Sequence, residues 1–275
     1  MRRPLALAAA LLVAGGCAAV ENRIVFFPHP YPIGDWTPDP RVEDVWIDSP
    51  DGARLHGWLA TPDGDPRAVV LFCHGNGRNV TTRRHVLELY RDRMNATVLV
   101  FDYRGYGKST GRPTEAGVLL DARAARRWLA ARTGVPEGDV VIAGHSLGGG
   151  VAVDLAAGDG ARALVLEGTF TNLPDVADHH VPLIPMRPLM LAELNSLRKI
   201  PNYRGPLLQV HGDADRIVPY ELGRRLFVAG NEPKEFVTVP NGNHNDLYTP
   251  AFVAALDRFL AALPRPAATG PAPEK

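Results

Sequence analysis

A serine between glycines is the clearest candidate for chemistry in this chain. The stretch Gly144-His145-Ser146-Leu147-Gly148 follows the apolar run VVIA and precedes a segment with helical spacing. Glycines two residues on either side of the serine leave room for a sharp strand-to-helix turn that holds the serine in a strained conformation. Such a turn exposes the serine Oγ at a helix N-terminus, where the dipole favours a developing negative charge. The pattern predicts that Ser146 is a nucleophile.

A nucleophilic serine needs a base, and the base needs a carboxylate that orients it. The best base is His244, in the polar loop PNGNHND that follows the last apolar strand pattern. Two acids, Asp213 and Asp215, follow His211 at the end of the preceding strand pattern. Spacing alone does not choose between these two carboxylates.

The reaction also needs donors for the negative oxygen of an acyl-transfer transition state, and backbone N–H groups commonly supply them. The stretch His74-Gly75-Asn76-Gly77 directly follows the strand pattern AVVLFC. One donor is expected from this loop and one from the residue after the nucleophile. We therefore expect the backbone N–H groups of Asn76 and Leu147 to form the oxyanion hole.

These residues must be positioned by alternating strands and helices. The sequence predicts a hairpin of strands 42–48 and 53–60, and then short, mostly apolar strands at 68–73, 97–101, 140–143, 163–166, 207–210 and 235–239. Helical spacing lies between them, at 81–94, 114–132, 147–157, 220–230 and 250–263. This alternation predicts an α/β fold: a doubly wound, mostly parallel sheet of about eight strands with helices on both faces. Ligands are then expected at the carboxyl ends of the strands.

Composition excludes several classes of protein. The 275 residues carry 30 basic and 30 acidic side chains, so a surface that coats nucleic acid is not expected. The two cysteines exclude a disulfide scaffold and an all-cysteine zinc fold. With 45% hydrophobic residues, the chain can fill a large core. No metal site is expected, and His179 and His180 are interpreted as residues of an exposed turn.

The two ends have a different character from the middle. Residues 1–16 combine a basic start with a short apolar run, which predicts a signal peptide, because about twelve helical residues span only roughly 18 Å of a bilayer core of about 30 Å. Residues 264–275 form a Pro/Ala-rich tail. The domain itself is predicted at 41–263, and Phe26, Phe27 and Tyr31 are aromatic residues that could fold back onto it.

Cys17 ends the predicted signal peptide in a context, VAGGC, that resembles a bacterial lipobox. We expect Cys17 to be lipidated and residues 17–40 to be a linker between the anchor and the domain. The expected location is the bacterial cell envelope, exported and anchored to a membrane by the lipid. Ordinary export to the periplasm or the medium is the alternative. Cys73 is interpreted as a small buried core residue.

Taken together, the motifs resemble the α/β-hydrolase superfamily of serine hydrolases. The similarity is greatest to a branch with HGN, DYRGYGKS, GHSLGG, HGDxDxxVP and GxH motifs. These occur here at 74–76, 102–109, 144–149, 211–219 and 242–244. That branch includes eukaryotic enzymes that remove palmitoyl groups from proteins, together with uncharacterised bacterial hydrolases.

The resemblance has several implications for this chain. The order serine, acid, histidine along the chain is the one expected in this superfamily. The fifth residue of the HGxxD string is the acid, which favours Asp215. No metal or organic cofactor is implied, and the DYRGYGKS stretch is interpreted as a loop that braces the oxyanion loop. No obligate protein partner is evident.

The substrate is expected to be a small or acylated ester or thioester. A Pro-rich insert at about 169–206 contains the apolar run 181–191. It is interpreted either as a short cap over Ser146 that accepts an acyl chain or as a segment packed on the sheet. Two other functions remain open: a serine peptidase similar to aminopeptidases, and a lipoprotein that binds a ligand without catalysis.

Overall fold

The computed structural model describes residues 25–264, and the predicted signal peptide, Cys17 and the C-terminal tail lie outside this range. The strands are β1 (Glu43–Asp48), β2 (Arg54–Ala60), β3 (Ala68–Cys73), β4 (Ala96–Phe101), β5 (Val141–His145), β6 (Leu164–Glu167), β7 (Leu207–Gly212) and β8 (Lys234–Val239). The α-helices are α2 (Arg84–Glu88), α3 (Glu115–Thr133), α4 (Leu147–Asp159), α5 (Leu173–His180), α6 (Ser196–Lys199), α7 (Tyr220–Ala229) and α8 (Pro250–Ala262). Shorter turns of helix are η1 (Val80–Arg83), η2 (Leu89–Arg93, a π-helix), η3 (Glu137–Asp139), η4 (Arg187–Leu189) and η5 (Ile200–Asn202).

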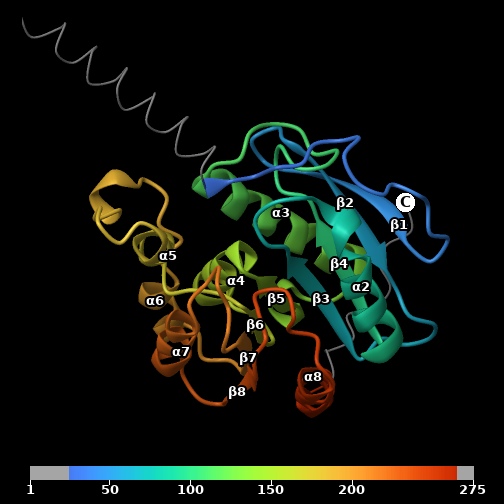
Figure 1. Cartoon of the computed structure of the whole chain (residues 1–275). Coiled ribbons are helices and arrows are strands. Elements are labelled where there is room, and N and C mark those ends of the chain that lie inside the picture. Colours follow the sequence, from blue (N-terminus) through green and yellow to red (C-terminus); the bar gives the residue numbers. More distant parts are fainter. Residues whose placement is uncertain (1–24, 265–275) are drawn as a thin grey trace, which may run out of the picture.

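The strands form one eight-stranded sheet in the order β1-β2-β4-β3-β5-β6-β7-β8 (Figure 1). The pairs β1–β2 and β2–β4 are antiparallel, and every other pair is parallel. This confirms the predicted doubly wound, mostly parallel sheet with an N-terminal hairpin. The strands β3, β5, β6 and β7 are neighbours, so their carboxyl ends meet at one edge of the sheet.

Helices cover both faces of the sheet and explain why its strands are apolar on both sides. In β3, Val69, Leu71 and Cys73 face a core that includes residues of α3, α4 and α7. The alternate residues Val70 and Phe72 face a second core that includes residues of α2 and α8. Both sets are buried, which removes the polar alternation of a half-exposed strand.

The N-terminal segment lies closer to the domain than expected. Residues 25–40 were predicted as part of a linker, yet Phe26 is 1% exposed. Isolated bridges pair Pro28 with Arg78 and Pro30 with Gly107. The alternative that aromatic side chains here fold back is therefore correct for Phe26. Burying this ring stabilises the contact by roughly 1.5–3 kcal/mol, which explains why the segment packs although it lacks regular structure.

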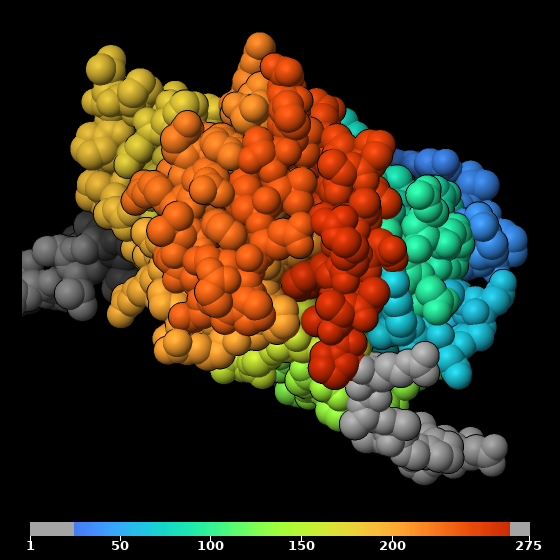
Figure 2. All heavy atoms as spheres, turned by 90° about the horizontal axis from the view of Figure 1, so that it is seen from below, coloured from blue at the N-terminus to red at the C-terminus, as the bar shows by residue number. Residues whose placement is uncertain are grey.

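The insert after β6 contains α5, η4, α6 and η5 and lies at one edge of the molecule (Figure 2, in gold). Its second half packs inward, and Leu194 is 1% exposed beside Gly150 of α4. Its apolar middle, residues 181–191, does not pack inward: Leu183 is 94% exposed and Leu189 is 62% exposed. Within residues 25–264, no helix is long and apolar enough to cross a bilayer.

Candidate active site

Ser146 occupies the sharp turn between β5 and α4 in a strained conformation. Its backbone has φ 55° and ψ −120°, a conformation that residues other than glycine rarely adopt. A Cβ at Gly144 would collide with the carbonyl oxygen of Gly148, and a Cβ at Gly148 would collide with that of Cys73. Both glycines of the motif are therefore required by close backbone contacts.

Neighbouring groups hold this turn in place. The Ser146 N–H donates to the Glu167 carbonyl oxygen (2.8 Å), and the Thr169 hydroxyl donates to the Ser146 carbonyl oxygen (2.9 Å). Strain of this kind costs about 1–3 kcal/mol and persists only where the surroundings enforce it. Two hydrogen bonds from the end of β6 supply that enforcement.

His244 is paired with Asp215 and not with Asp213. The Nδ1–H of His244 donates to Asp215 Oδ2 over 2.7 Å, and the Asp215 side chain is fully buried. Asp213 is exposed and accepts a hydrogen bond from the Asn241 backbone N–H. The geometry thus separates the two acids that spacing left open.

The Asp215 carboxylate is held in its ionised form by several donors. Burial alone would raise its pKa, but hydrogen bonds from His211 and His244 outweigh burial and hold the pKa of Asp215 well below its ordinary value. The backbone N–H groups of Ile217 and Val218 donate to Oδ1 over 2.8 and 2.9 Å. The contact with His211, at 3.3 Å, was not predicted from the sequence.

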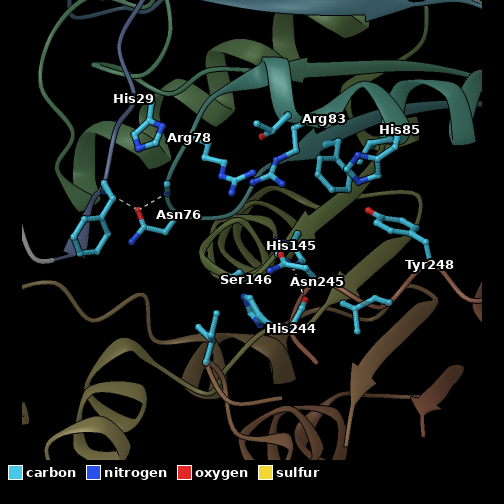
Figure 3. A pocket seen from close by; sticks show the side chains of 17 residues that line it. His29, Asn76, Arg78, Arg83, His85, His145, Ser146, His244, Asn245 and Tyr248 are labelled. Atoms are coloured by element: carbon cyan, nitrogen blue, oxygen red, sulfur yellow. Dashed lines mark hydrogen bonds between the residues drawn. The ribbon is translucent and has the colours of Figure 1, made fainter. Parts of the chain in front are cut away.

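Ser146 and His244 line the same cavity, of about 750 Å³ (Figure 3). In the described part of the chain, no hydrogen bond yet joins the Ser146 hydroxyl to the His244 ring. Such contacts are often long without substrate and tighten when it binds. Because Nδ1 is engaged by Asp215, Nε2 is the His244 ring nitrogen that is left to accept a proton.

His145 supports the position of His244 from within the serine turn. Its Nε2–H donates to the His244 carbonyl oxygen (3.2 Å), and the two rings lie 4.8 Å apart. Burial, together with repulsion from His244 and Arg83, lowers the pKa of His145 well below its ordinary value. His145 is therefore a neutral ring that ties the serine turn to the histidine loop.

The loop predicted to form the oxyanion hole is fixed by the side chain of Asn76. Its Oδ1 accepts from the N–H groups of Phe27 and Gly77, both at 2.9 Å, and from the Tyr106 hydroxyl at 3.0 Å. Its Nδ2 donates to the Val25 carbonyl oxygen. These bonds explain why an asparagine occupies position 76, because one amide side chain links the loop, the N-terminal segment and the DYRGYGKS stretch.

The backbone N–H groups of Asn76 and Leu147 come from neighbouring elements. Cys73 at the end of β3 pairs with Gly144 of β5, and Leu147 is the first residue of α4. The two predicted donor segments therefore lie next to each other at the carboxyl edge of the sheet. A helix N-terminus supplies N–H groups that have no partner within the helix.

The DYRGYGKS stretch, residues 102–109, braces this loop as expected. Asp102 is fully buried and accepts from the Val80 N–H (2.9 Å), with His74 Nε2 at 3.5 Å. The Tyr103 hydroxyl donates to the His74 carbonyl oxygen (3.0 Å). Arg104 pairs with Asp121 over 2.7 Å and anchors the stretch to α3.

The residues that line the cavity differ from those expected. None comes from the insert at 169–206, so its exposed apolar run is not a cap over Ser146 in this structure. Most of the walls come from the N-terminal segment, the stretch 76–86 and the stretch 244–248, and Phe72, Ile217 and the serine turn complete them. Sequence reasoning missed Arg78 and Arg83, because a lone arginine in a loop carries no recognisable pattern.

Another missed residue is Glu167, at the end of β6. It is fully buried, and its carboxylate accepts from the Tyr248 hydroxyl over 2.7 Å. Burial raises the pKa of Glu167 to about 7, although Tyr248 and Arg83 act in the opposite direction. No group of three or more metal-binding side chains occurs in the part of the chain described here.

Comparisons with known proteins identify the family of this chain. Residues 70–196 match the Alpha/beta hydrolase family. The chain is 37% identical over 265 residues to the uncharacterized protein MT2364 of Mycobacterium tuberculosis, covering 94% of both. It is 30% identical over 259 residues to protein bem46 of Schizosaccharomyces pombe, covering 88% of this chain and 86% of that one. The Pyrococcus furiosus esterase Pf2001 has a similar fold, with a TM-score of 0.71, 22% identity and coverage of 86% of this chain and 99% of that one. The chain belongs to the alpha/beta hydrolase family.

Proposed function

We propose that this protein is a serine hydrolase that cleaves carboxylic esters or thioesters. The observation that carries the proposal is the strained Ser146 in the same cavity as a His244 ring that is hydrogen-bonded to the buried Asp215. A binding protein has no need for a strained serine beside such a pair. The esterase fold of the structural neighbours agrees with this reaction but does not specify a substrate.

The proposed reaction has two halves. His244 Nε2 takes the Ser146 proton as Oγ attacks the carbonyl carbon, and His244 then protonates the leaving alcohol or thiol. An acyl-enzyme remains on Ser146. A water molecule, deprotonated by His244, attacks the acyl carbon. The bond from this carbon to Ser146 Oγ then breaks, Oγ takes the proton back from His244, and the acid is released. In both halves the backbone N–H groups of Asn76 and Leu147 are proposed to stabilise the negative oxygen.

A peptidase similar to aminopeptidases is the second candidate, and the cavity argues against it. Such an enzyme must bind the free amine of its substrate, a cation that a nearby carboxylate would stabilise. The cavity instead presents Arg78 and Arg83, which repel an amine. A lipoprotein that only binds a ligand is the third candidate.

Turnover of matched substrates tests these functions. We expect the wild-type protein to hydrolyse p-nitrophenyl butyrate and not alanine p-nitroanilide, and Ser146→Ala to lose at least about 10³-fold in kcat. Thr171→Ala is a control in a buried hydroxyl residue that does not line the cavity. Turnover of the anilide alone would favour the peptidase. Equal ester turnover by Ser146→Ala would contradict the proposed nucleophile.

A further inference from the structure

Two arginines face the cavity that contains the proposed nucleophile. The side chains of Arg78 and Arg83 extend toward the same part of the cavity, across from Ser146 and His244 (Figure 3). Arg78 is exposed at the cavity, whereas Arg83 is half-buried. Burial lowers the pKa of Arg83, and repulsion from Arg78 lowers it further.

Neither guanidinium has a carboxylate partner. Within residues 25–264, no Asp or Glu oxygen lies within 4.0 Å of a nitrogen of Arg78 or Arg83. The Nε of Arg83 is buried and has no hydrogen-bond partner in this part of the chain. Arg104, by contrast, is paired with both Asp51 and Asp121. The two cavity arginines thus have free donors that point at the substrate space.

The backbone is held in place at both arginines. Arg78 has φ 65°, a strained value for a residue other than glycine, and its carbonyl oxygen accepts from the His29 N–H (3.4 Å). Arg83 ends η1, whose first N–H, from Val80, donates to the buried Asp102. The structure therefore places a pair of cations at the wall of the cavity that contains Ser146.

Other charged groups near the pair do not neutralise it. Glu167 acts on Arg83 electrostatically, but its carboxyl group is hydrogen-bonded to Tyr248 and does not line the cavity. His29 and His85 also line the cavity, and neither side chain supplies a negative charge. Close cations in a partly buried space are unfavourable unless an anion compensates them. A substrate could supply that anion.

We propose that the substrate carries a carboxylate or phosphate group that binds Arg78 and Arg83 while its ester or thioester lies at Ser146. Guanidinium groups recognise both anions through paired N–H donors, and such charge-assisted bonds are stronger than neutral ones. This inference rests on the proposed hydrolase function and specifies its substrate class. The protein is then a hydrolase of acidic esters, and a purely apolar acyl chain is a poorer substrate.

Matched esters test the charge preference directly. Monoethyl adipate and ethyl hexanoate have acyl chains of the same length and differ in a terminal carboxylate, and release of ethanol measures both reactions. We expect kcat/KM to be about 10- to 100-fold higher for the charged ester. The same ratio should fall toward one in Arg78→Gln, in Arg83→Gln and in the double variant.

Arg93→Gln is the matched control, because Arg93 is an exposed arginine of η2 that does not line the cavity. It removes the same charge from the protein and should keep the wild-type ratio. A second pair, acetylglycerol 3-phosphate and monoacetylglycerol, presents the anion as a phosphate on the alcohol side. Preference for either anionic ester supports the proposal, and the larger preference identifies the group and the side that the arginines bind.

Binding to Ser146→Ala gives a readout that does not need turnover. Calorimetric titration should show tighter binding of monoethyl adipate than of ethyl hexanoate, and Ser146→Ala/Arg83→Gln should lose that difference. If neither anionic ester is preferred over its uncharged partner in binding or in kcat/KM, the anion site is wrong, while ester turnover would still uphold the hydrolase. If the charged ester binds tightly and no ester is cleaved, the anion site stands and the hydrolase proposal falls.

Discussion

At the scale of single residues, the Asp215–His244 pair determines which proton transfers are possible. Asp215 accepts from the His244 Nδ1–H and from two backbone N–H groups, so its carboxylate has a fixed orientation. That orientation leaves His244 Nε2 for the proposed proton transfer from Ser146. A carboxylate is needed here, because an amide can present a donor to Nδ1 and stabilise the wrong tautomer.

We predict that Asp215→Asn lowers kcat for p-nitrophenyl butyrate by about 10³–10⁴-fold with little change in fold. The amide oxygen can still accept from the backbone, while its NH₂ group faces His244. Asp213→Asn is the control, because Asp213 is exposed and only its acceptor role is used. If both variants lost activity equally, the assignment of Asp215 would be wrong.

Glu167 gives a prediction about pH and stability. Burial raises its pKa from 4.5 to about 7, so between these values the unfolded chain ionises first and folded Glu167 retains its proton. The contribution of Glu167 to stability is therefore fully present below pH 4.5 and is lost as pH rises to about 7. Each pKa unit corresponds to about 1.4 kcal/mol, so the loss is on the order of 3 kcal/mol.

Urea unfolding of wild type and Glu167→Gln at pH 5 and pH 8 measures this loss. The variant should gain stability relative to wild type as the pH rises, because glutamine does not ionise. Glu221→Gln removes an exposed carboxylate and should show no such trend. A constant difference between wild type and Glu167→Gln at the two pH values would contradict the raised pKa.

At the scale of elements, close backbone contacts hold the turn between β5 and α4. Apolar spacing predicted the strands well, because β3 and its neighbours are buried on both faces. The GxSxG pattern predicted the turn because close backbone contacts leave no room for a Cβ at either of its glycines. Sequence patterns did not predict the bonds of Asn76 to Phe27 and Tyr106, since these join segments far apart in the chain.

We predict that Gly148→Ala destabilises the protein by about 1–3 kcal/mol or more, because its Cβ meets the backbone of Cys73 and His74. In an ordinary helix interior the same change stabilises by roughly 1 kcal/mol. The melting temperature and ester turnover should both fall. Gly138→Ala, at a site with open space, is the control. If Gly148→Ala were as stable and active as wild type, the turn would accommodate a Cβ at position 148, and the claim that the glycine is required would be wrong.

At the scale of the whole molecule, the order of motifs predicted the fold and the site region, but not the walls of the cavity. The walls depend on how the N-terminal segment packs beside Asn76, which no local pattern encodes. The apolar run at 181–191 suggested a cap, yet its placement depends on the anchoring of Leu194 and Glu193 to distant elements. The positive charge of the cavity comes from Arg78 and Arg83, which belong to no recognisable sequence motif.

We also propose that the protein is exported and tethered by a lipid on Cys17, as the sequence pattern predicts. Mass spectrometry of the protein from a bacterial envelope fraction should find an N-terminal peptide that begins at a diacylated Cys17. Cys17→Ser should move the protein into the soluble fraction with its ester turnover intact. An unmodified Cys17 in the mature protein would contradict the anchor without affecting the hydrolase proposal.

The central claim is that Ser146 is the activated nucleophile of this cavity, and a fluorophosphonate probe tests it most directly, because the probe forms a stable bond only with an activated serine. Peptide mapping of the labelled wild-type protein should place one adduct on Ser146. Labelling should be absent in Ser146→Ala and strongly slowed in His244→Ala. An unlabelled wild-type protein, or equal labelling of Ser146→Ala, would contradict the account.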